Sequence, residues 1–204
     1  MDNKKCQTKK WFKDLCNLIC AEFEAIELEG GAGSKKLRPG KFKQKNWYRS
    51  DSSQSQGGGG IMSVLHGRVF EKVGVNISTV HGAFTPEFQK EIPGAEQNPN
   101  FWASGISVVA HLCSPLVPAV HMNTRFIVTS KAWFGGGTDL TPMLPDQSAK
   151  TFFHRHQDSR YGGALLPTRG NIHDLSGAIT YKIEIITLYL QGHLTPTIAA
   201  TTKH

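Results

Sequence analysis

The sequence contains no apolar run of about 18 residues, which excludes a conventional membrane-spanning helix. Cysteine is scarce: the 204 residues include four, none in a C-x-x-C pair, so neither a disulfide framework nor a thiolate zinc site is predicted. The N-terminal stretch MDNKKCQTKK is charged and lacks the apolar core of a secretory signal. We therefore expect a cytoplasmic protein without a membrane span. At 39% hydrophobic and 19% charged residues, the chain is not of the disordered class.

Acidic residues are outnumbered, and the formal net charge is +7. The excess is concentrated near the start, where residues 1–50 hold twelve of the 23 Lys and Arg residues but six of the 16 Asp and Glu residues. A basic stretch at 35–45 allows three interpretations: a nucleic-acid patch, a solvated loop, or long-range attraction of a polyanionic small molecule. The stretch lacks interleaved stacking aromatics, which favours the solvated loop over nucleic-acid binding. We expect no nucleic-acid partner.

The chain length predicts one domain with a hydrophobic core. Apolar residues recur at three- and four-residue steps over 10–29, which predicts an amphipathic helix ended by Gly30 and Gly31. Residues 30–60 read as a polar loop. Strands are predicted at Ile61–Leu65 and Arg68–Ser78, separated by a turn at His66 and Gly67.

Two further strands are predicted at Gly105–His111 and Val120–Ser130. Side chains alternate across a strand, so each segment separates into an apolar face and a polar face. The polar set consists of Ser107 and His111 from the first segment and of His121, Asn123 and Arg125 from the second. If the two strands are neighbours, these residues form a polar wall that a sheet tolerates toward solvent or in a ligand cavity.

The segment that follows, 135–142, is predicted to be a Gly-rich loop that presents one carboxylate, Asp139. It has neither the G-x-G-x-x-G spacing of a dinucleotide-binding turn nor the Gly-Lys-Ser/Thr of a phosphate loop. Singly, a strand histidine, a strand arginine and an aspartate after glycines are more often structural than functional. Together on one predicted surface, they indicate a site for an anionic ligand.

Three segments carry a specific resemblance: GGGGIMSVLHGRVFEKVGVNISTVHG at 57–82, FWASGISVVAHLCSPLVPAVHMNTRF at 101–126, and WFGGGTDLTP at 133–142. With these motifs, and with the H-x9-H spacing of His111 and His121, the sequence resembles the oxygen-dependent coproporphyrinogen-III oxidases of haem biosynthesis. The resemblance covers roughly residues 10–155.

The resemblance implies oxidative decarboxylation of two propionates of coproporphyrinogen III to vinyl groups, with O2 as co-substrate, giving protoporphyrinogen IX. It implies an α+β fold with a large, mostly antiparallel sheet flanked by helices, here incomplete, and a homodimer. No organic cofactor is implied. His121 takes the general-acid role. The site residues carried over are, as catalytic groups, His121, Asp139 and Arg125; as substrate contacts, Ser107, Asn123, Thr124, Arg125 and Asp139; and as divalent-metal ligands or, equally, proton-shuttling histidines, His111, His121 and His154.

The resemblance stops after about residue 155, and the family's later motifs have no counterpart in residues 156–204. We therefore expect residues 1–155 to form the N-terminal part of a coproporphyrinogen oxidase-like domain, followed by a divergent tail at 156–204. The alternative to an active oxidase is an inactive truncated or frameshifted remnant that at most binds porphyrin-like anions.

Overall fold

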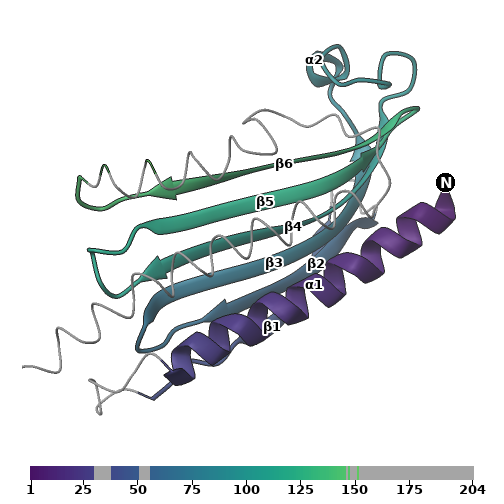
Figure 1. Ribbon diagram of the computed structural model, residues 1–204. Coiled ribbons are helices and arrows are strands. Elements are labelled where there is room, and N and C mark those ends of the chain that lie inside the picture. The colour runs from purple at the N-terminus through teal and green to yellow at the C-terminus, as the bar shows by residue number, and fades with distance from the viewer. Residues whose placement is uncertain (30–37, 51–55, 146, 148–150, 152–204) are drawn as a thin grey trace, which may run out of the picture.

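A computed structural model describes residues 1–29, 38–50, 56–145, 147 and 151. The described elements, in chain order, are α1 (Asp2–Glu29), β1 (Lys43–Ser50), β2 (Gln56–Leu65), β3 (Phe70–Ala83), α2 (Pro86–Gln89), β4 (Asn100–Leu112), β5 (Ala119–Val128) and β6 (Ala132–Thr141). The strands form one six-stranded sheet in which each strand pairs antiparallel with the next, and α1 runs along one face of it (Figure 1). The expected α+β class with an antiparallel sheet is confirmed. No helix in these ranges is long and apolar enough to span a membrane.

Several predicted boundaries were wrong. The predicted loop at 30–60 contains β1 and the first half of β2, because Gly57–Gly60 continue as a strand between β1 and β3. The glycine stretch at 135–137 is likewise part of β6 rather than a loop. The helix also begins earlier than predicted, at Asp2.

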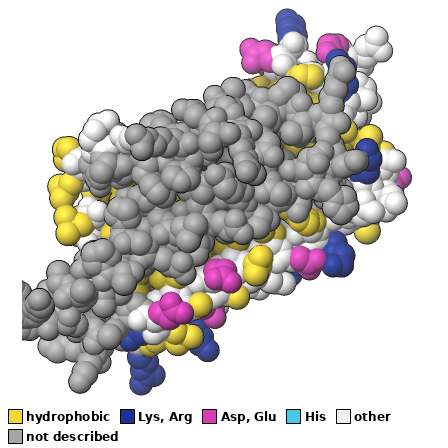
Figure 2. Space-filling view, in the orientation of Figure 1, with side chains coloured by type: hydrophobic (Ala, Val, Ile, Leu, Met, Phe, Trp, Pro, Cys, Tyr) yellow, Lys and Arg dark blue, Asp and Glu magenta, His cyan; other side chains and the backbone are white. Residues whose placement is uncertain are grey.

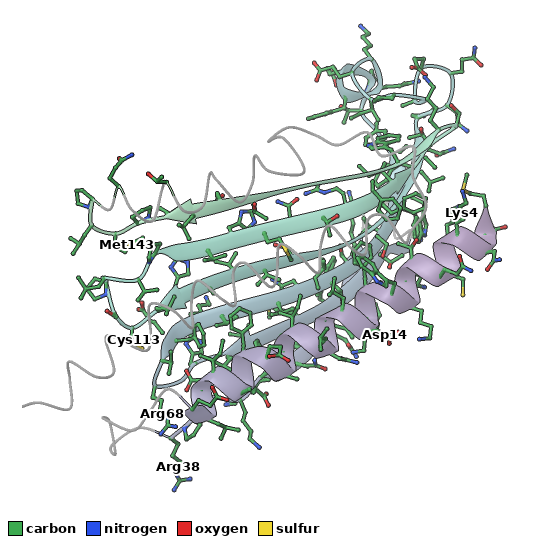
Figure 3. All side chains as sticks on the ribbon, viewed as in Figure 1. Lys4, Asp14, Arg38, Arg68, Cys113 and Met143 are labelled. Carbon is green, nitrogen blue, oxygen red and sulfur yellow. The ribbon has the colours of Figure 1, made fainter. Side chains whose placement is uncertain are left out.

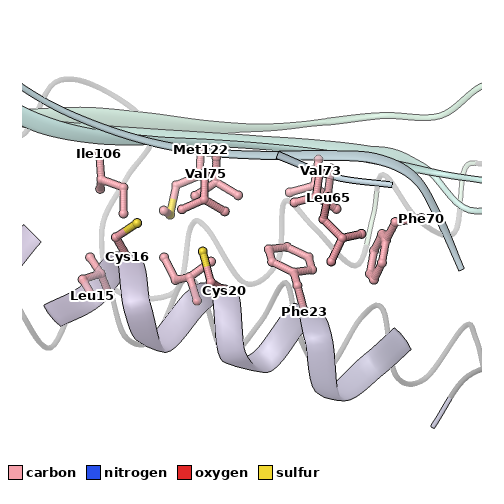
Figure 4. Close-up of a cluster of buried hydrophobic side chains, with 14 of the residues drawn as sticks. Leu15, Cys16, Cys20, Phe23, Leu65, Phe70, Val73, Val75, Ile106 and Met122 are labelled. Carbon is pink, nitrogen blue, oxygen red and sulfur yellow. The ribbon is translucent and has the colours of Figure 1, made fainter. Parts of the chain in front are cut away.

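The hydrophobic core lies between α1 and the helix-facing side of the sheet (Figure 4). The helix contributes a buried stripe that includes Phe12, Ile19 and Phe23, as its three- and four-residue spacing predicts. Alternate residues of β3 and β5, such as Val75 and Met122, point toward that stripe. The outer surface of α1 carries acidic and basic side chains together, as expected for a face in contact with water (Figure 2).

Cys16 and Cys20 are also buried in this core, one helical turn apart. The Cys16 Sγ lies 4.0 Å from the Ser63 hydroxyl of β2. The Cys20 thiol, Ser63 and the charge of Lys13 all act to lower the pKa of Cys16, to about 6. Hydrogen bonding to Cys16, together with burial, raises the pKa of Cys20. Both cysteines lie where the helix approaches β2.

The C-terminal end of α1 is fixed to the sheet by a fully buried carboxylate, Glu27. Its two oxygens accept hydrogen bonds at 2.8–2.9 Å from four backbone N–H groups, those of Gly40, Arg68, Val69 and Phe70. Four N–H donors satisfy the acceptor sites of the Glu27 carboxylate, which is how this group is accommodated in the interior.

The Arg68 side chain reinforces the same junction. Its Nε donates to the Glu27 carbonyl at 2.9 Å and its Nη2 to the Leu28 carbonyl at 2.8 Å, so it caps free carbonyls at the end of α1 (Figure 3). Gly67 is required here because a Cβ at this position would lie 2.3 Å from the Glu27 carboxylate.

We predict that Glu27→Gln lowers the free energy of unfolding by about 2–3 kcal/mol, because an amide presents one acceptor oxygen and directs its NH2 group at N–H donors. Urea denaturation followed by circular dichroism measures the change. Glu22→Gln, an exposed position on the same helix, serves as the matched control and should change stability by less than about 0.5 kcal/mol. Equal effects of the two substitutions would contradict the anchoring role.

Candidate functional site

The face of the sheet opposite α1 carries the polar residues that the sequence singled out. Register places Ser107 of β4 opposite Asn123 of β5, and His121 of β5 opposite Asp139 of β6. Arg125 lies on the same face, opposite Gly105 on one side and Gly135 on the other. The predicted polar wall is therefore formed, and it extends onto β6. We call this surface the polar face.

His121 and Asp139 are the directly interacting pair on the polar face. The His121 Nδ1 and the Asp139 Oδ2 lie 3.3 Å apart, and the side chains are 38% and 61% exposed. A carboxylate only accepts hydrogen bonds, so this contact assigns the proton to Nδ1 and leaves Nε2 directed away from Asp139. Exposure leaves both groups accessible to a ligand, which is what a proton-transferring pair requires.

Arg125 is the cationic group nearest this pair along β5. Its Nη2 donates to the Asn123 Oδ1 over 3.4 Å, and it forms no ion pair within the described part of the chain. An exposed guanidinium held by a neutral amide keeps donors for an incoming carboxylate, which it can bind through two parallel hydrogen bonds.

Asn76 of β3 belongs to the same row of the polar face and was not among the predicted site residues. It pairs with Ser107, and its side-chain oxygen is buried with no hydrogen-bond partner among the described residues. A buried acceptor that lacks a donor is costly, so this oxygen is available to a donor from a ligand. The sequence signal for it was an amide within the predicted strand 68–78.

Part of the polar face carries no side chains, because two residues of β6 on this face, Gly135 and Gly137, are glycines; we call this part the bare surface. A Cβ built on Gly135 or on Gly137 meets nothing within 4 Å, and neither residue has a positive φ. Neither packing nor backbone conformation therefore requires glycine at these two positions. They lie beside Arg125 and Asn123 and leave the backbone of β6 open to close approach by a flat ligand.

Gly136 differs from its two neighbours. A Cβ there would lie 2.4 Å from the carbonyl oxygen of Asn123, on the helix-facing side of the sheet. Packing therefore explains this glycine, whereas it does not explain the other two.

The polar face is also electropositive. Lys43 and Lys45 of β1 and Lys72 of β3 share it with Arg125 and are exposed, whereas Asp139 is the acidic residue that the register places there among the described strands. Such a surplus of cations attracts polyanions over a distance of about 10 Å at moderate salt.

Thr124 does not share the polar face. It is 5% exposed, on the helix-facing side, and its hydroxyl donates to the Gly135 carbonyl at 3.2 Å. The reason is the period of two: Asn123 and Arg125 point one way, so the residue between them points the other. The side chain of Thr124 thus braces β5 against β6 behind the surface that the neighbouring residues form.

The three expected metal-ligand histidines are not assembled in the described residues. His111 is on the polar face opposite Lys72 and diagonal to His121, while His154 lies outside the described residues. Within the described ranges, no group of three or more His, Cys, Asp or Glu side chains is placed to hold a metal ion. The donors among the described residues do not by themselves form a metal centre, and we derive no step through one.

Comparison with known proteins gives the family. A sequence model described as coproporphyrinogen III oxidase matches residues 7–161, so the chain belongs to that family. It is 56% identical over 154 residues to the oxygen-dependent coproporphyrinogen-III oxidase of Rickettsia felis, covering 76% of this chain and 53% of that protein. Against the Rickettsia bellii protein of the same name, identity is 57% over 154 residues, covering 74% and 53%. The chain thus spans about half the length of the curated relatives it matches.

A second family model, described as a protein of unknown function (DUF1670), matches residues 136–204. It overlaps the first match over residues 136–161, from the middle of β6 onward, and continues through the segment for which the sequence showed no resemblance to the oxidases. The description carries no function that can be transferred.

We predict that Gly137→Ala leaves the free energy of unfolding within about 1 kcal/mol of the original, because its Cβ enters open space and alanine lowers the entropy cost of a strand glycine. Gly136→Ala should lower it by more than about 1 kcal/mol, because its Cβ meets the backbone of β5. Thermal or urea unfolding of the two variants decides the matter. A Gly137→Ala variant as unstable as Gly136→Ala would show that folding stability requires glycine at position 137.

Proposed function

We propose that this chain carries the substrate-binding surface of an oxygen-dependent coproporphyrinogen-III oxidase and catalyses oxidative decarboxylation of two propionates of coproporphyrinogen III. The observation that carries the proposal is the polar face, on which Arg125, His121 and Asp139 lie beside the bare backbone at Gly135 and Gly137. Membership of the family supports it, since the matched relatives are named for this reaction.

The chemistry of the substrate agrees with the groups on this face. Coproporphyrinogen III carries four propionates and a ring of pyrrole N–H donors. Arg125 would hold one propionate through paired hydrogen bonds, with Ser107 and Asn123 as further polar contacts. The Asp139 carboxylate, an acceptor only, suits the N–H groups at the centre of the macrocycle. The lysines of β1 and β3 would draw the tetra-anion toward the face.

The reaction balances with dioxygen as the oxidant. Each propionate, –CH2–CH2–COO⁻, becomes a vinyl group, –CH=CH2, by loss of CO2, one proton and two electrons. Two propionates release four electrons, which reduce one O2 to two molecules of water with a net uptake of two protons. His121, held in one tautomer by Asp139 at 3.3 Å, would move a proton at its Nε2.

A second candidate function is binding of porphyrin-like anions without turnover. It rests on the extent of the match, since the aligned region covers 53% of the relatives and the residues of their remaining part are not represented on the polar face described here. We further propose, from family resemblance, that the active form is a cytoplasmic homodimer and that residues 1–155 form its oxidase-like part, with 156–204 as a divergent tail.

We predict that, in a chain that turns over coproporphyrinogen III, Arg125→Ala and Asp139→Ala each lower the rate by at least about 10²-fold, because each removes a group that pairs with or positions the reacting substrate. Oxygen-dependent formation of product, oxidised to the porphyrin and followed by fluorescence, measures this. The Rickettsia felis relative assayed in parallel is the positive control. Unchanged rates in either variant would contradict the assigned roles.

Binding separates the two candidate functions. We predict that coproporphyrin III, the oxidised and fluorescent form, binds the unaltered chain, and that Arg125→Ala and Gly137→Ala each weaken binding about tenfold through a lost ion pair and a methyl group on the bare surface. Fluorescence anisotropy reports the affinity, and Lys10→Gln on the outer surface of α1 is the control that changes net charge alone. Binding without oxygen-dependent turnover supports the second candidate, and failure to bind contradicts both.

A further inference from the structure

A cavity of about 690 Å³ lies on the helix-facing side of the sheet, away from the polar face. It is lined by the N-terminal half of α1, the ends of β1 and β3 and the starts of β2 and β4. Its volume falls in the range of small-molecule sites. The strands that line it belong in part to the family motifs, but the proposed reaction does not use this face of the sheet.

The charged side chains that line the cavity are all basic. Lys9 and Lys13 come from α1 and Arg49 from β1, and none of the described lining residues is acidic. Lys9 and Lys13 stand four residues apart and so share one face of the helix. Lys5, one turn earlier, continues the stripe, and its Nζ lies 5.6 Å from the ring centre of Trp102, a lining residue.

Lys9 and Lys13 form no ion pair within the described part of the chain, in contrast to the lysine between them. The Nζ of Lys10 lies 2.6 Å from the Asp14 carboxylate, and both side chains are exposed (Asp14 is labelled in Figure 3). Lys10, which does not line the cavity, therefore has an acidic partner, as does Lys5, whose Nζ lies 3.9 Å from Asp2. Lys9 and Lys13, which line the cavity, have none among the described residues.

Aromatic rings and two hydrogen-bonded hydroxyls line part of the cavity. Trp102 and Tyr48 present rings, and Tyr48 is 83% exposed. The hydroxyl of Ser104 donates to the Ser78 carbonyl at 3.0 Å and lies 2.9 Å from that of Thr79. Because these two hydroxyls have partners, Lys9, Lys13 and the rings are the features on which the binding argument rests.

We propose that this cavity binds a planar aromatic anion, meaning an aromatic ring system that carries a carboxylate or a phosphate. The rings of Tyr48 and Trp102 would contact its faces or edges, and Lys9 and Lys13 would bind its oxyanion. This site is distinct from the polar face, because the side chains of Thr79 and Ser104 lie on the helix-facing side of the sheet, whereas Asn76 and Ser107 of the same two strands lie on the other side.

The test is isothermal titration of the full chain with 1-naphthoate, 1-naphthyl phosphate and the neutral 1-naphthalenemethanol. We expect an anionic probe to bind at least about tenfold more tightly than the neutral one, with the preferred anion identifying carboxylate or phosphate. The double variant Lys9→Gln/Lys13→Gln should remove that preference without changing affinity for the neutral probe. Tyr48→Ala, at an exposed position, should weaken all three probes.

Two controls keep the outcome decisive. Lys10→Gln removes a charge from the same helix turn, and Arg125→Ala removes the main cation of the polar face; both should leave anion binding within about twofold of the original. A loss in Lys10→Gln equal to that of the double variant would show an effect of net charge alone. A loss in Arg125→Ala would place the anion on the polar face. Either of these two results would overturn the proposal, as would equal binding of the neutral probe or no binding of any probe. None of these measurements depends on oxidase activity.

Discussion

The structure depends on how the buried Glu27 carboxylate joins α1 to the sheet. Four backbone N–H groups from two separate segments converge on its oxygens, so the helix end, the turn between β2 and β3 and the segment before β1 are held together at one point. This junction decides which face of the sheet α1 covers. The opposite face is not covered by α1, so polar side chains are tolerated there, and that is where the polar residues lie.

Antiparallel pairing then builds the site from residues distant in sequence. Successive strands contribute to shared rows, so Asn76, Ser107 and Asn123 come to lie side by side although they belong to three strands. The same pairing brings Asp139 to His121. A sheet surface of this kind is flat, and the absence of side chains at Gly135 and Gly137 flattens its edge further, which suits a planar polyanion better than a compact one.

Cations on the two faces have different surroundings, and this difference separates the two proposed sites. On the polar face they share the surface with a carboxylate–imidazole pair, which can transfer protons as well as bind anions. In the cavity beside α1 they adjoin aromatic rings and satisfied hydroxyls, which offer binding but no proton-transferring pair among the residues described. The lysines of the first 50 residues are thus divided between two surfaces: Lys9 and Lys13 line the cavity, and Lys43 and Lys45 lie on the polar face.

The sequence by itself determined the family, the amphipathic helix and the division of β5 into two faces, because these follow from local motifs and from periods of 3.6 and two. It misjudged β1, β2 and β6, where lysine- and glycine-rich segments become strands only because neighbouring strands supply their hydrogen-bond partners. Tertiary structure alone decided that Asn76 joins the site and that packing requires glycine at position 136 of β6 but not at 135 or 137. Pairing register is a long-range property, and no local pattern in a single strand encodes which residue of another strand will stand opposite it.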